Sequence, residues 1–175
     1  MRRAQLLLIC LTVMLSPCNS HGTDKPVRFS DIRPELESVT EQLSAHINLF
    51  EDILNKMDAS AKANQRYNEQ KNIFLSSQLA ITTIVAILEY NRDLMVLFGD
   101  LKDENRKKFY GIRIESLETS VKQIKNMYKQ ILINYTIFPS DFFEQALVNA
   151  ERRTIMSSIA SLEKCIALLE SVNQK

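Results

Sequence analysis

Apolar residues in the middle of the chain recur at alternating intervals of three and four positions. The clearest stretch holds nine such residues, at successive spacings of 4, 3, 4, 3, 4, 3, 4 and 3. A stripe of this kind stays on one side of an α-helix over about eight turns, which requires a long partner helix alongside. The nine residues predicted to form this core seam are Tyr110, Ile114, Leu117, Val121, Ile124, Tyr128, Ile131, Tyr135 and Phe138.

Three other segments follow the same spacing less regularly. They span residues 36–57, 74–98 and 155–169, and the first two include the polar seam members His46 and Asn91. A buried asparagine commonly fixes the register of packed helices, and a seam histidine would hydrogen-bond across a bundle. The pattern therefore predicts four helices, two of which have polar residues in their seams.

Breakers and caps predict where the helices end. The polar stretch 59–65 separates the first two seams, and Gly99 has the position of a C-terminal cap for the second helix. Pro139 ends the third helix, because proline cannot continue one. Asp141 followed by Glu144 is a capping-box pattern for the start of the fourth.

These elements predict an all-α fold, an antiparallel up-down-up-down four-helix bundle with coiled-coil-like seams over residues 30–175. The 175-residue chain has only three glycines and four prolines, fewer than the turns of an all-β or βαβ fold need. In the alternative arrangement the first two helices form one rod and the chain dimerises. The sequence thus allows a monomer or a homodimer.

The N-terminus has the pattern of a secretory signal peptide at residues 1–20. Arg2 and Arg3 precede an uncharged run over residues 6–15, and small polar residues follow. The run is shorter than the ~20 residues that span a bilayer, so cleavage is expected rather than anchoring. Residues 21–29 are predicted to form a disordered leader. The mature protein is expected in the periplasm or outside the cell.

Charge and cysteine content narrow the function classes. The chain has 22 basic and 21 acidic residues with the two signs interspersed, so the basic stripe of a nucleic-acid-binding protein is not expected. Signal cleavage removes two of the three cysteines. Cys165 then has no partner for an internal disulfide.

Neither a catalytic constellation nor a cofactor motif is evident. The chain lacks Cys-x-x-Cys-His, Glu-x-x-His and glycine-rich phosphate loops, so the sequence predicts no catalytic residue, no metal ligand and no cofactor. The one ligand hypothesis is a haem held by His46 and Met156, which would lie at similar levels on the first and last helices.

An uncharged run at residues 72–88 approaches the length of a membrane span, although polar residues dilute it. Membrane contact through this run is one functional hypothesis, and core binding of a small apolar ligand or haem is another. The hypothesis that the sequence favours is an exported, non-enzymatic bundle that acts as a protein-interaction or scaffold module for a protein partner it does not identify.

Overall fold

Four long α-helices make up the described part of the chain. The computed structural model describes residues 26–173, so the predicted signal peptide and most of the predicted leader lie outside the described residues. Each helix contains 29–35 residues, or about 45–50 Å at 1.5 Å per residue. The helices are α2 (Phe29–Ala63), α3 (Tyr67–Asp100), α4 (Asp103–Ile137) and α5 (Gln145–Asn173).

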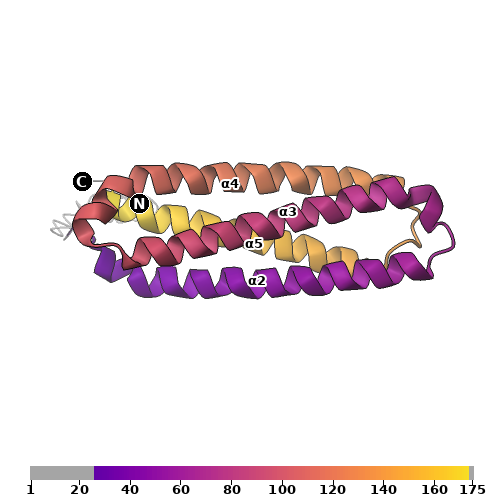
Figure 1. The fold of residues 1–175 in the computed structure, drawn as a ribbon, viewed down its shortest axis with the longest axis horizontal. Coiled ribbons are helices and arrows are strands. Elements are labelled where there is room, and N and C mark those ends of the chain that lie inside the picture. Colours follow the sequence, from indigo (N-terminus) through magenta and orange to yellow (C-terminus); the bar gives the residue numbers. More distant parts are fainter. Residues whose placement is uncertain (1–25, 174–175) are drawn as a thin grey trace, which may run out of the picture.

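The helices alternate in direction around one core (Figure 1). α2 and α4 each pack against both α3 and α5, so successive helices are neighbours and α5 closes the bundle against α2. The prediction of an antiparallel up-down-up-down bundle is confirmed. The single-rod alternative is wrong, because residues 64–66 turn the chain between α2 and α3, where the Asn64 side chain accepts a hydrogen bond from the Arg66 backbone at 2.9 Å.

The predicted α4 seam is only partly the buried face of that helix. Six of its nine residues are buried, whereas Ile114, Tyr128 and Tyr135 are partly buried and pack at its edge. Polar residues occupy much of the remaining buried stripe, at positions seven or fourteen apart. They are Arg106, Arg113, Ser120 and Asn134.

On α2, His46 is not the core residue that the spacing predicted. Its side chain is partly buried, and the neighbouring Ile47 is only 4% exposed. Asn91 on α3, by contrast, is completely buried. The buried stripe of α2 thus passes through Ile47 at this level and not through His46, as expected from the cost of removing a polar ring from water.

Several predicted helix boundaries are wrong. The leader prediction extended through Phe29, which instead starts α2 and is 9% exposed. Gly99 lies inside α3 and does not have the positive φ of a glycine cap. The start of α5 is Gln145, four residues after Asp141, because Phe142 and Phe143 are buried in the preceding loop against an aromatic cluster.

Candidate functional site

Two serine–asparagine pairs join α3 to α4 inside the bundle. The Asn134 side-chain amide donates to Ser77 Oγ at 2.9 Å, and the Asn91 amide donates to Ser120 Oγ at 2.9 Å. The asparagine belongs to α4 in one pair and to α3 in the other. On each helix the two polar positions are fourteen residues apart, which is four helical turns. The pairs therefore fit only one register of the two helices.

A buried arginine extends the second pair. Arg113 is 5% exposed, and its Nη2 donates to both the backbone oxygen and Oδ1 of Asn91 at 3.0 Å. Its Nη1 reaches Ser116 Oγ at 3.3 Å. Burial lowers the pKa of Arg113, and among residues 26–173 no carboxylate forms a salt bridge with it. Since a buried cation is costly, neutral acceptors must supply its stabilisation here.

Arg106 caps the C-terminal end of α3. Its Nε donates to the Phe98 carbonyl at 3.2 Å, and its Nη2 donates to the carbonyls of Gly99, at 3.0 Å, and Leu101. The guanidinium carbon also lies 3.7 Å from the centre of the Phe29 ring, a cation–π contact. The side chain of Arg106 thus satisfies carbonyls that a helix end leaves unpaired, in place of the predicted glycine cap.

One carboxyl group is buried in the core. Glu151 on α5 is 1% exposed, and its Oε2 accepts a hydrogen bond from the Tyr135 hydroxyl on α4. Its Oε1 is buried and has no hydrogen-bond partner among the described residues. Burial raises the pKa of Glu151 to about 7, although the Tyr135 hydrogen bond acts in the opposite direction.

A carboxyl group with a pKa near neutrality is a possible proton donor or acceptor, but a reaction also needs access to substrate. Neither Glu151 nor Tyr135 lines the three best-defined cavities of the described residues. The largest, of about 750 Å³, lies at the end of the bundle and is bounded by Pro26 and Asn173, the two limits of the described chain. The Glu151–Tyr135 pair is therefore a core feature.

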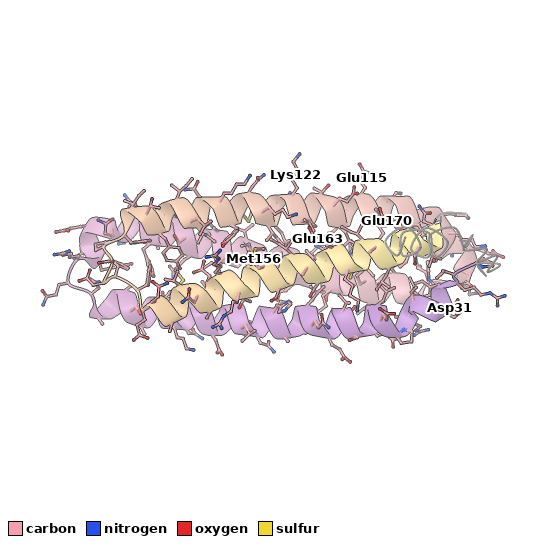
Figure 2. The ribbon with its side chains drawn as sticks, turned by 180° about the vertical axis from the view of Figure 1, so that it is seen from behind. Asp31, Glu115, Lys122, Met156, Glu163 and Glu170 are labelled. Carbon is pink, nitrogen blue, oxygen red and sulfur yellow. The ribbon has the colours of Figure 1, made fainter. Side chains whose placement is uncertain are left out.

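The residues of the haem hypothesis do not share a buried surface. Met156 is 50% exposed on α5 (Figure 2), whereas His46 is partly buried with an unpartnered Nδ1 among the described residues. Burial lowers the pKa of His46 and raises that of the fully buried Cys165 thiol to about 11. Such a thiol is unreactive at neutral pH. No group of three or more potential metal-ligating side chains occurs within residues 26–173.

The most distinctive surface is the outer side of the α3–α4 pair. It is defined by the positions that flank the buried stripes of both helices on the side where the two helices meet. From α3 these positions are Ile73, Ser76, Ala80, Thr83, Ile87, Tyr90, Leu94 and Leu97. From α4 they are Phe109, Ile112, Ser116, Thr119, Gln123, Asn126, Gln130, Ile133 and Ile137. None of these seventeen residues is charged or fully buried. We call this surface the α3–α4 face.

Exposed apolar side chains lie near both ends of the α3–α4 face. Leu97 and Ile112 are 62% and 64% exposed near one end, and Ile133 and Ile137 are just over half exposed near the other. Between them is a shallow groove of about 420 Å³, which is lined by Tyr90, by small residues such as Ala86 and, from the α4 edge, by Glu115. By length and composition α3 could cross a membrane, yet only 33% of its most apolar 18-residue window is buried in the bundle.

The other three inter-helix surfaces are charged. A polar or ionic contact crosses each of them, as on most soluble bundles. These contacts are Gln78–Asp58 between α3 and α2, Lys164–Glu35 between α5 and α2, and Lys125–Glu163 between α4 and α5. At the α3–α4 junction, by contrast, hydrogen bonds lie inside and the outer side carries only uncharged side chains.

Charges border the α3–α4 face along its two long edges. The next positions outward on α3 include Asp93 and Asp100, and those on α4 include Lys108, Lys122 and Lys129, with Glu115 as the exception. Figure 2 shows Glu115 and Lys122 projecting from the outer side of α4. The α3 edge is therefore acidic at one end only, where Asp93 also pairs with Arg92 at 2.9 Å, and the α4 edge is mainly basic.

Comparison of the chain with protein-family models, with curated proteins and with solved structures gives no match. The proposed function therefore rests on the fold and on the surface of the bundle. Reasoning from the sequence missed Arg106, Arg113, Ser120 and Glu151. The first three could have been found from a seven-residue repeat that they share with Asn134. This repeat lies four residues before the one that contains Tyr110 and Leu117.

Proposed function

We propose that the mature protein is an exported, non-enzymatic helical bundle that docks another protein on its α3–α4 face. The observation that carries the proposal is the absence of charge from all seventeen residues of that face. Exposed apolar patches bordered by polar residues are typical of protein-interaction sites. Export is inferred from the signal-peptide pattern at residues 1–20.

The buried polar groups support this use of the face. The Ser77–Asn134 and Asn91–Ser120 pairs fix the register of α3 and α4, so the side chains on the outside are held in one arrangement. A surface that is already ordered loses less conformational entropy when a partner binds. The geometry therefore favours docking by a preformed face over docking by a segment that folds on contact.

Contact with lipid is the second candidate function, because α3 is long and apolar enough to enter a bilayer. The edges of the face argue against it. A helix that lies on an anionic membrane is bordered by lysine and arginine, whereas the α3 edge carries Asp93 and Asp100. The charges thus favour a protein partner whose own edges carry both positive and negative side chains.

Photo-crosslinking tests the proposal. A photoreactive amino acid at position 112, in the chain exported in its own host, is expected to form a covalent adduct of defined mass. The same residue at position 156 on α5, a site of similar exposure outside the face, is the control and should give no adduct. Equal labelling at both positions, or none at 112, would contradict a docking role for the face.

A further inference from the structure

We infer that the partner of the α3–α4 face is a second copy of this chain, related by a twofold axis parallel to the bundle. The inference rests on the proposed docking function, since it names the partner of that same surface. In such an arrangement the two faces pack against each other, and α3 of each copy lies on α4 of the other. The contact is isologous, so every residue pair occurs twice.

The size of the face suits a dimer. Two adjacent helices of about 50 Å, with axes 8–10 Å apart, present a surface roughly 18 Å wide and on the order of 900 Å² in area. Stable interfaces bury about 800 Å² on each partner. One identical face is therefore sufficient to cover the uncharged surface.

The charged edges select the orientation of the two copies. The Ser77–Asn134 and Asn91–Ser120 pairs show which residues of α3 and α4 are level with each other. On that scale Asp100 is within one turn of Lys108. An axis parallel to the bundle places Asp100 of one copy between the levels of Lys108 and Glu115 of the other, and Asp93 between those of Glu115 and Lys122, so each aspartate has a lysine within about one turn. An axis perpendicular to the bundle would reverse one copy and place α4 on α4, so that Lys122 of one copy lies near the level of Lys129 of the other and basic meets basic.

The same orientation also matches the groove and the apolar ends. Tyr90 of each copy comes level with Thr119 and Gln123 of the other copy, which line its groove. An axis parallel to the bundle keeps each residue at the same height along the bundle. Ile112 therefore meets the apolar residues at its own end of the face on the second copy, and Ile133 meets those at the opposite end. The exposed tyrosine thus faces a recess, and apolar groups face apolar groups.

Sedimentation equilibrium tests the inference on the full chain, expressed with its signal and purified after export. The unaltered protein should have twice the mass of one chain. Ile112→Lys places a charge at the interface and should raise the dimer dissociation constant by about 100-fold or more. Met156→Lys, at a site of similar exposure on α5, should leave it unchanged. Circular dichroism should show equal helix content in all three proteins.

A charge exchange tests the axis. Lys108→Asp places acid opposite Asp100 and is expected to weaken the dimer about tenfold, and adding Asp100→Lys should restore it. A dimer that the exchange does not restore would overturn the proposed orientation. A protein that is monomeric at all concentrations, or a dimer insensitive to Ile112→Lys, would overturn the inference as a whole.

The crosslink at position 112 separates failure of this inference from failure of the docking function. An adduct of twice the chain mass supports both. An adduct of any other mass overturns the second copy as partner and leaves the docking function standing. Flotation with vesicles of anionic phospholipid, without a protein adduct, overturns both.

Discussion

Replacing Glu151 by glutamine is expected to change how the free energy of unfolding depends on pH. The carboxyl group is 1% exposed, and burial raises its pKa from the ordinary 4.5 to about 7. Between these two values the native protein keeps the proton and the unfolded chain loses it. The native state therefore binds more protons, and stability falls as pH rises.

The magnitude follows from the size of the shift. At 1.36 kcal/mol per pKa unit, a rise from 4.5 to about 7 corresponds to about 3 kcal/mol. This stabilisation is complete below pH 4.5 and is lost as pH rises through about 7. Glutamine resembles the protonated carboxyl and does not titrate. The Glu151→Gln protein should match the unaltered protein at pH 4.5 and exceed it by about 3 kcal/mol at about pH 8.

Urea denaturation followed by circular dichroism over this pH range measures the effect. The other carboxyl groups contribute equally to both proteins, so they cancel in the difference between the two curves. Glu163→Gln is the control on the same helix, since Glu163 is half exposed and pairs with Lys125 on the surface. Its difference from the unaltered protein should stay within about 1 kcal/mol at every pH. A constant offset between the Glu151→Gln and unaltered curves would refute the reasoning.

Four further substitutions, two of them also combined, test the polar interior by the same denaturation assay. Tyr135→Phe removes the hydroxyl that donates to Glu151 and that lowers the pKa of this carboxyl group. The free energy of unfolding should therefore fall by a further 1–2 kcal/mol or so above pH 7 but change little at pH 4.5. Arg106→Ala leaves carbonyls at the end of α3 unpaired and should cost about 2–4 kcal/mol, and a loss below 1 would contradict its capping role. Asn91→Ala and Arg113→Ala, alone and together, should show a coupling of about 1.5–3 kcal/mol, whereas additive losses would mean that the two side chains do not interact.

The fold could be predicted from the sequence because spacing alone carries it. Intervals of three and four repeat over residues 110–138, and such a stripe is stable only against other helices. The number and the order of the helices follow from these spacings. The start of α5 could not be placed, because Asp141 and Glu144 form a local capping pattern whereas Phe142 and Phe143 pack against residues distant in sequence.

The buried polar network was harder to predict for a physical reason. Two sets of positions flank Leu117 and Ile124 on α4, one on each side. The set that includes Ile114 and Tyr128 is the more apolar, so a criterion based on hydrophobicity selects it as the buried set. The buried set includes Arg113, because Asn91 on α3 supplies acceptors for it. A single helix contains no information about its partner. Glu151 was missed for the same reason, since its donor lies on another helix.

The two serine–asparagine pairs also constrain how the length of this chain can vary among its relatives. A shift of α4 by one heptad would leave the apolar stripe continuous but would separate Asn91 from Ser120 and Asn134 from Ser77. Each separation strands buried polar groups without partners, which costs about 1–3 kcal/mol per group. Insertions and deletions are therefore expected outside the hairpin from Ser77 to Asn134, as in the exposed turn at residues 64–66, and the hairpin is expected to keep its length.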